Sequence, residues 1–397
     1  MASYQNKKYY YVLIILVVVI LSTQQKVIAN FWHQKIIHDL PSVEVVAENF
    51  NHPWSLAFLP DGAKLITERG GKLWWLSANN QQRTMINGLP KITVIGQGGL
   101  LDVVLHPQFD KNQWIYLSYV EATKPEQANI NGLAVARAKL DSINKKLTNF
   151  EVIFRQMPKV ASSGHFGGRL VFAKDGSLFI TLGDRQTADQ RGYAQDLTRH
   201  NGKVIRILDD GRIPSNNPFV KHAQAKADIW SYGHRNIQGA TLHPQTGELW
   251  ASEHGPQGGD EINIVRAGKN YGWPIITYGC EYGSCEAIGE GQKKEGMEQP
   301  LITWQPTSTA PSGLLFYTGK GFTEWQGQLF SGSLAGQTLW RIEVKDNKII
   351  HRHAMPLDMR LRDVRQGLDG WIYVLTDENN GKLLRIYAFL TSKQYGS

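Results

Sequence analysis

The 397-residue sequence has few cysteines and few long apolar runs, and both shortages exclude whole classes of protein. Two cysteines, Cys280 and Cys285, are too few for a disulfide-dense scaffold. One long apolar run, at the N-terminus, is too few for a polytopic membrane protein. The chain also lacks a Ser or Cys nucleophile motif, a Walker-type loop and HExxH. With 42% hydrophobic and 20% charged residues, it can still bury a sizeable core.

The single long apolar run has the layout of a secretory signal peptide. Two lysines precede an apolar stretch over residues 9–21, and the segment that ends at Ala29 resembles a small-residue cleavage site. We therefore expect a signal peptide over residues 1–29, a mature chain over residues 30–397 and export to the periplasm. An uncleaved membrane anchor is the alternative, but the run is short for a span of about 20 residues.

The charge of the chain is modest and evenly spread. Its 43 Lys and Arg residues exceed its 35 Asp and Glu residues by 8. The basic residues are scattered among acidic ones rather than clustered, so we expect no nucleic-acid partner. The excess indicates either simple solubility or a preference for an anionic ligand.

The two cysteines lie close together in the sequence. In an exported protein Cys280 and Cys285 can be oxidised, and Gly283 between them favours a turn, so a local disulfide is expected. Free thiols are the alternative. A zinc site is disfavoured because no further Cys or His lies nearby to complete the ligand set.

One local pattern returns along the chain: a turn carrying Asp, Asn or Gly, followed by a short alternating strand rich in aromatic residues. These turns lie at residues 60–62, 110–112, 174–176, 245–247, 325–327 and 368–370. A spacing of roughly 40 to 80 residues is typical of four-stranded blades with variable loops. A β-sandwich would not repeat the unit so often. We therefore predict an all-β chain that forms a six-bladed β-propeller as a single domain, with residues 43–47 closing the ring against the last blade.

Polar segments concentrate where these strands are expected to end, and the first pair has two interpretations. His165 lies among glycines that would leave its imidazole accessible, so it is either a general base or a histidine that caps a turn. Asp184 follows a strand and a glycine, so it either orients His165 or closes a turn.

Two other segments suggest an anion and a cation as ligands. Arg360 and Arg362 alternate, so in a strand both face one side, where they repel each other unless an anion lies between them. This spacing favours a carboxylate-bearing ligand, although solvated arginines are the commoner case. Gly255, Pro256 and residues 258–261 offer carbonyl and carboxylate oxygens to calcium, but their spacing is not that of an EF-hand.

Six long motifs then point to one family. They are GQGGLLDVVLHPQF, HFGGRLVFAKDG, GHRNIQGA, EHGPQGGDEIN, GKNYGWP and RLRDVRQG. The chain resembles the soluble quinoprotein glucose/sorbosone dehydrogenases, and most closely the periplasmic aldose sugar dehydrogenases, over nearly the whole mature chain. The resemblance implies a six-bladed propeller that holds pyrroloquinoline quinone (PQQ) and calcium, in agreement with the number of repeats.

The resemblance also implies roles for single residues. His165 matches the catalytic base, and Asp184 matches the acid that orients it. Contacts to the quinone are matched by Gln97, Arg235, Asn236, Arg360 and Arg362, of which Arg235 also supports charge on the reduced cofactor. The cofactor calcium is matched by the carbonyls of Gly255 and Pro256, and a second, structural calcium by Glu261 and Tyr271. Ala335 stands where many relatives place a lysine, so one ionic contact to PQQ is missing or replaced by backbone groups.

These assignments lead to a functional expectation. We expect oxidation of an aldose at C1 to its lactone, with the hydride passing to PQQ and the electrons to an external acceptor that the sequence does not identify. One alternative is a calcium-dependent propeller hydrolase of the lactonase type, which would need no paired arginines. The other is a non-catalytic ligand-binding propeller.

Overall fold

The computed structural model describes residues 41–124 and 126–388. Glu44–Arg385 form one compact unit. The predicted signal peptide lies outside the described residues, so it stays a prediction. Among the residues that the structure describes, no helix combines the length and the apolar character needed to cross a bilayer.

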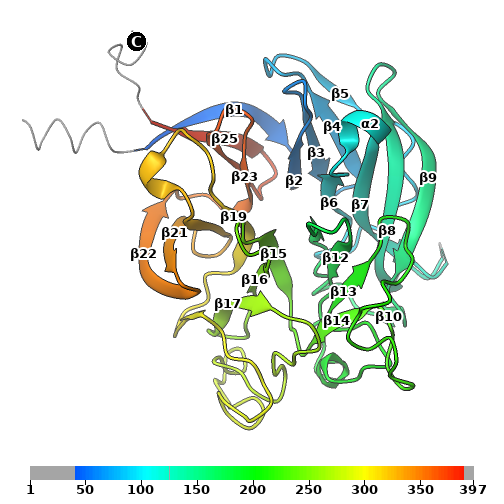
Figure 1. Cartoon of the computed structure of the whole chain (residues 1–397), viewed down its shortest axis with the longest axis vertical. Helices are drawn as coiled ribbons and strands as arrows, with labels where there is room; N and C mark the ends of the chain where they lie inside the picture. Colours follow the sequence, from blue (N-terminus) through cyan, green and yellow to red (C-terminus); the bar gives the residue numbers. More distant parts are fainter. Residues whose placement is uncertain (1–40, 125, 389–397) are drawn as a thin grey trace, which may run out of the picture. The chain divides into compact units, whose positions relative to one another are not determined.

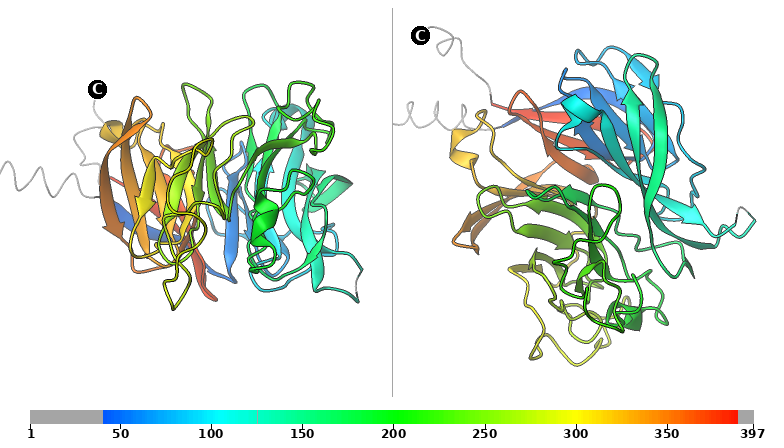
Figure 2. Two further views of the ribbon diagram at one scale, coloured as in Figure 1. Left: turned by 90° about the horizontal axis from the view of Figure 1, so that it is seen from below. Right: turned by 45° about the vertical axis from the view of Figure 1, so that its right-hand side comes forward.

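Within Glu44–Arg385 the strands form six sheets around a common centre (Figures 1 and 2). The first strands of the sheets surround this centre, and the later strands lie progressively further out (Figure 1). Neighbouring strands pair in antiparallel register, for example Leu56 with Ile66 in the first sheet. The architecture is a six-bladed β-propeller, so the predicted all-β fold is confirmed.

The blades follow one another along the chain. Blade 1 contains β2 (Pro53–Phe58), β3 (Lys64–Glu68), β4 (Lys72–Leu76) and β5 (Arg83–Met85). Blade 2 contains β6 (Leu100–Leu105), β7 (Trp114–Ala122), β8 (Ile130–Asp141), β9 (Lys146–Arg155) and β10 (Val160–Ala161). Blade 3 contains β11 (Leu170–Phe172), β12 (Leu178–Thr181), β13 (Lys203–Ile207) and β14 (Ile229–Tyr232). Blade 4 contains β15 (Ile237–Leu242), β16 (Leu249–Glu253), β17 (Asp260–Val265) and β18 (Ile302–Trp304). Blade 5 contains β19 (Pro311–Phe316), β20 (Leu329–Ser333), β21 (Thr338–Lys345) and β22 (Lys348–Pro356). Blade 6 contains β23 (Leu361–Gln366), β24 (Ile372–Thr376), β25 (Gly381–Tyr387) and β1 (Ser42–Phe50). Short helical turns are α2 (Phe109–Asn112), η1 (Arg191–Ala194) and η2 (Thr323–Trp325).

The repeated turns of the sequence have one structural meaning. Each lies between the first and the second strand of a blade, from the turn at 60–62 between β2 and β3 to the turn at 368–370 between β23 and β24. The last blade takes its fourth strand from the other end of the chain, because β1 lies beside β25. The predicted closure of the ring by residues 43–47 is therefore confirmed, within a slightly longer strand.

Apolar side chains fill the spaces between neighbouring blades. Leu65 of blade 1 and Leu117 of blade 2 belong to one such cluster. Between blades 4 and 5, the rings of Trp250 and Phe316 meet edge to face with centroids 5.1 Å apart. These buried apolar contacts hold each blade against the next.

The centre of the propeller, by contrast, is polar and charged. Arg169, Asp102, Asp363 and Arg365, which we call the channel network, come from blades 2, 3 and 6. Arg169 Nη1 lies 3.0 Å from Asp363 Oδ1, and Arg365 Nη2 lies 3.1 Å from Asp102 Oδ1. Backbone groups complete the set: Asp363 accepts from the Leu56 amide at 3.0 Å. The channel network thus ties several blades together along the axis.

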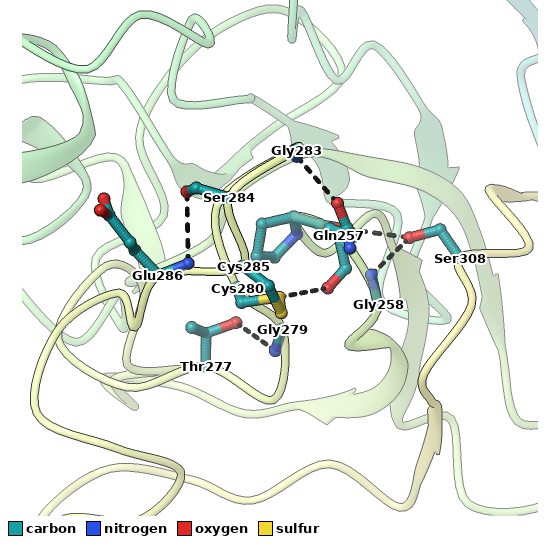
Figure 3. The surroundings of a disulfide bond; sticks show 11 residues. Gln257, Gly258, Thr277, Gly279, Cys280, Gly283, Ser284, Cys285, Glu286 and Ser308 are labelled. Atoms are coloured by element: carbon teal, nitrogen blue, oxygen red, sulfur yellow. Dashed lines mark hydrogen bonds between the residues drawn. A yellow bond between two sulfur atoms is a disulfide. The ribbon is translucent and has the colours of Figure 1, made fainter.

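The cysteines lie in the long connection between β17 and β18 (Figure 3). Cys280 and Cys285 form a disulfide, so the expected local bond is confirmed over the free-thiol alternative. The Cys280 and Gln257 backbones exchange two hydrogen bonds of 3.0 and 3.1 Å. The Gly283 amide also donates to Gln257 Oε1 at 3.0 Å. The disulfide-closed loop is therefore fastened to the segment that follows Pro256.

Candidate active site

One end of the propeller gathers nearly all the candidate residues, and the antiparallel hairpin explains why. In each blade the start of the first strand and the end of the second strand meet at the same end of the sheet. Residues before a first strand are Gln97, His165, Arg235, Asn236 and Arg360. Residues after a second strand are Arg69, Asp184, Gly255, Pro256 and Asp377. Segments far apart in the chain therefore converge at one mouth of the channel.

His165 and Asp184 form a hydrogen-bonded pair in blade 3. His165 Nδ1 lies 2.7 Å from Asp184 Oδ1, and the other carboxylate oxygen accepts from Trp273 Nε1 at 2.7 Å. The His165 amide donates to Gln97 Oε1 at 2.9 Å. His165 Nε2 makes no hydrogen bond with any described residue. The geometry leaves one imidazole nitrogen available while the other is held by a carboxylate.

The glycines around this pair allow close packing rather than exposure. His165 is only 5% exposed, so the expectation of an accessible imidazole is wrong. A Cβ on Gly183 would lie 2.1 Å from the His165 carbonyl oxygen, and one on Gly164 would lie 1.7 Å from Gln186 Oε1. His165 itself has φ +44°, a left-handed conformation that is uncommon outside glycine. The two loops can therefore approach closely only because glycine occupies both contact points.

Burial controls the protonation of the pair. Burial lowers the pKa of His165 below its ordinary value, although the hydrogen bond that His165 donates to Asp184 acts in the opposite direction. For Asp184, burial opposes ionisation, but the hydrogen bond and charge of His165 bring its pKa below the ordinary value. A neutral imidazole beside an ionised carboxylate is the arrangement that a general base requires.

A cavity of about 170 Å³ is lined by three arginines and by Phe166 and Gly167, which directly follow His165, although neither His165 nor Asp184 lines it. We call it the arginine cavity. Its lining residues include Arg69, Arg360, Arg362, Asp377, Gln97, Asn236, Gln238, Trp54 and His254. Four of the predicted cofactor contacts, Gln97, Asn236, Arg360 and Arg362, therefore share one space. Ala335 is exposed and is not among the residues that line this cavity.

The anion between the paired arginines is part of the chain itself. Asp377 Oδ2 lies 2.9 Å from Arg362 Nη2 and 3.6 Å from Arg360 Nη2. Asp377 is buried, yet the adjacent Arg362 guanidinium and its hydrogen bond hold the pKa of this carboxyl far below its usual range. The sequence favoured a carboxylate-bearing ligand as the anion at these arginines, and the structure shows that a carboxylate of the chain itself already occupies this role. Asp377 neutralises one charge, and Arg362 Nε remains buried without a hydrogen-bond partner.

Arg235 connects the His165–Asp184 pair to the loop that follows β16. Its carbonyl oxygen accepts from the Asp184 amide at 2.8 Å. Its guanidinium donates to the carbonyl oxygens of His254, at 3.0 Å, and Gly255. The Pro256 carbonyl accepts from Ser308 Oγ at 2.9 Å. Both carbonyls predicted to bind calcium are thus hydrogen-bonded within the protein.

A second, smaller cavity of about 20 Å³ lies against Arg235, Gly255 and Pro256, and Glu261 and Tyr271 line it. Burial and the nearby Glu253 carboxylate raise the pKa of Glu261 to about 8. The Tyr271 hydroxyl donates to the Ile264 carbonyl at 2.5 Å. Over the described ranges, no group of three or more His, Cys, Asp or Glu side chains converges as in a metal cluster.

Several residues of the site have no signal that sequence reasoning could use. Asp377 and Arg69 are ordinary polar residues near strand ends, outside any pattern that marks chemistry, and Gln238 lies in the GHRNIQGA motif without a role assigned to it. Trp273 stands within the GKNYGWP motif, but nothing in that motif indicates a hydrogen bond to Asp184. Position in the blade, after a second strand, is the one shared feature that would have identified Arg69 and Asp377.

Comparisons with known proteins agree on one group. The family model described as Glucose / Sorbosone dehydrogenase matches residues 50–385. The aldose sugar dehydrogenase of Escherichia coli (strain K12) is 45% identical over 349 residues, which cover 87% of this chain and 92% of that protein.

Solved structures give the same result. The soluble aldose sugar dehydrogenase from Escherichia coli in its apo-form superposes with a TM-score of 0.83 at 44% identity, covering 88% of this chain and 100% of that one. The PQQ-bound form of aldose sugar dehydrogenase from Streptomyces coelicolor gives a TM-score of 0.71 at 26% identity, covering 87% and 98%.

Proposed function

The chain belongs to the glucose/sorbosone dehydrogenase family, and we propose that it oxidises aldose sugars at C1 to the lactone with PQQ and calcium as cofactors. The observation that carries the proposal is the His165–Asp184 pair, with a free Nε2, beside a cavity rich in arginine. A base would remove the hydroxyl proton of the sugar, and an anionic redox cofactor would accept the hydride.

The arginine cavity fits an anion with more than one charge. Three arginines face one aspartate, which leaves two positive charges uncompensated. His254, the other titratable group that lines this space, stays neutral, because burial and the neighbouring Arg362 and Arg235 lower its pKa to about 3. PQQ carries three carboxylates, and guanidinium groups bind carboxylates through paired hydrogen bonds. Arg360, Arg362, Gln97 and Asn236 would hold it.

The calcium part of the proposal rests on donor chemistry. The carbonyl oxygens of Gly255 and Pro256 are the hard ligands that calcium prefers. Arg235 already donates to Gly255, and a guanidinium repels a nearby cation. Calcium binding therefore requires Arg235 to leave this carbonyl. In the smaller cavity a cation would relieve the repulsion between Glu253 and Glu261, and Tyr271 would offer its carbonyl, since its hydroxyl is engaged.

The chain's own residues then divide the chemistry among them. His165 Nε2 takes the proton of the C1 hydroxyl, while Asp184 holds Nδ1 and stabilises the imidazolium that results. The C1–H bond breaks, hydride leaves with the electron pair, and C1 becomes the lactone carbonyl carbon. When bound, PQQ supplies the acceptor for this hydride, and an external acceptor later receives the electrons. Arg235 offers positive charge close to the pair.

Reconstitution tests the proposal against both alternatives. Purified protein is supplied with PQQ, calcium, both or neither, and reduction of an artificial acceptor is followed across a panel of sugars. We expect turnover only with both additions. Full turnover without PQQ would contradict the proposal, and lactone hydrolysis with calcium alone would favour the hydrolase. Binding of sugar without any turnover would favour the non-catalytic propeller.

Export to the periplasm is a further part of the proposal, supported by the N-terminal pattern described above. N-terminal sequencing of the native protein should find a start near Asn30. An intact Met1 on the native protein would contradict cleavage.

A further inference from the structure

Arg69 differs from the other arginines of the cavity in the contacts of its guanidinium. It makes no hydrogen bond or ion pair with any described residue, whereas Arg362 pairs with Asp377 at 2.9 Å. Asp377 is the one acidic residue among those that line the arginine cavity, and it is already shared by Arg362 and Arg360. The charge of Arg69 still helps to lower the pKa of Asp377 from a distance, after the larger effect of Arg362. The hydrogen-bonding groups of its guanidinium are therefore available to a ligand.

The backbone holds Arg69 firmly at the cavity. It follows β3, its amide donates to the His52 carbonyl at 3.1 Å, and its carbonyl accepts from the Leu100 amide at 3.1 Å. A Cβ on Gly99 would lie 1.8 Å from the Arg69 carbonyl oxygen and 3.0 Å from its Cγ. The GQGG segment can lie against Arg69 only because residue 99 is glycine. The Arg69 backbone is therefore fixed by hydrogen bonds while its guanidinium remains able to bind a ligand.

We propose that Arg69 binds a carboxylate of the anionic cofactor. Ala335 is neutral, exposed and not part of the cavity lining, so it adds no charge there. Arg69 is a third cation in a cavity where Arg362 is partly neutralised by Asp377. The inference rests on the proposed function, because it names a residue that holds the same cofactor.

The test is equilibrium binding of PQQ, which needs no turnover. PQQ is titrated into purified protein with calcium, and quenching of tryptophan fluorescence gives Kd for wild type, R69Q and R69K. We expect R69Q to raise Kd about 10- to 100-fold, the effect of losing one hydrogen-bonded charge pair. R69K keeps the charge but loses the paired geometry, so its Kd should lie between the two.

The matched control is R212Q, which removes one positive charge from a side chain that is 75% exposed and paired with Asp210. It should bind PQQ as wild type does. Thermal midpoints of the Arg69 variants should lie close to wild type, because R69Q loses only the longer-range attraction to Asp377 and no hydrogen bond to a described residue. R69Q with an unchanged Kd would overturn the inference and leave the proposed function intact. Wild-type protein that binds no PQQ would overturn both, and the titration separates these outcomes.

Discussion

The channel network and the arginine cavity use the same residue type a few residues apart, yet their charge balance differs. In the channel network, two arginines face two aspartates, so the buried charges cancel. In the arginine cavity, three arginines face one aspartate, so two positive charges remain. Arg362 belongs to both regions: its carbonyl accepts a hydrogen bond from Arg169 of the channel network, and its side chain lines the arginine cavity.

This contrast separates charges that stabilise the fold from charges that await a ligand. Burying a charge away from water is costly unless a partner offsets the cost. In the channel network the offset comes from within the chain. In the arginine cavity Arg69 and Arg360 still reach water, and we propose that the cofactor becomes their partner when it binds.

The largest expected effect comes from removing the proposed base beside the cavity. H165A should lower kcat by about 10²- to 10⁴-fold, since proton transfer loses its acceptor. The arginines stay in place, so PQQ Kd should remain near wild type. Steady-state kinetics and a PQQ titration measure the two quantities separately.

The control for H165A is H222A, which changes an exposed histidine. Near-normal turnover of H165A at saturating PQQ and sugar would remove His165 from the role of base. Loss of PQQ binding would instead make it a residue that holds the cofactor.

The comparison predicts opposite outcomes for one arginine from each region. R169L leaves Asp363 and Asp102 with only Arg365 as a counter-charge, so we expect a loss of about 3–5 kcal/mol in the free energy of unfolding. R360Q changes a side chain that is 44% exposed and whose ion pair with Asp377 is long, at 3.6 Å. The free energy of unfolding should therefore change by less than about 1 kcal/mol.

Urea denaturation of the two variants measures this difference directly. R360Q should instead weaken PQQ binding, a property that R169L does not address. Equal losses of stability in both variants would show that the two regions do not differ in the way their charge balance indicates.

The smallest effect concerns pH. An ordinary histidine is half protonated at about pH 6.5. Burial lowers the pKa of His165, so its imidazole is still mostly neutral at that pH. Activity that depends on neutral His165 should hold its plateau through pH 6.5 and fall only as the pH drops through the lowered value. The pH profile of kcat at saturating PQQ, calcium and sugar measures it. An acid limb centred at or above pH 6.5 would contradict the assignment.

Much of the fold was readable from the sequence because a blade is built from local signals. A turn residue such as Gly62 or Gly370 and the alternating strand that follows it lie within about ten residues, so each repeat can be recognised on its own. The site was readable only where a motif marked it. The interpretation of His165 stayed divided between a base and a turn cap, because spacing alone does not say which groups an imidazole will meet.

The sequence by itself indicated the number of blades and the local disulfide, and it marked His165 and Asp184 as a candidate pair. Only the tertiary structure decided that Asp377 neutralises Arg362, that Arg69 lines the same cavity without a hydrogen bond from its guanidinium to the described residues, and that His165 is buried. The physical reason is that the free energy of a charge depends on its distance to other charges and on its access to water. Both are set where strands from different blades meet, and neither can be read from the order of residues along one strand.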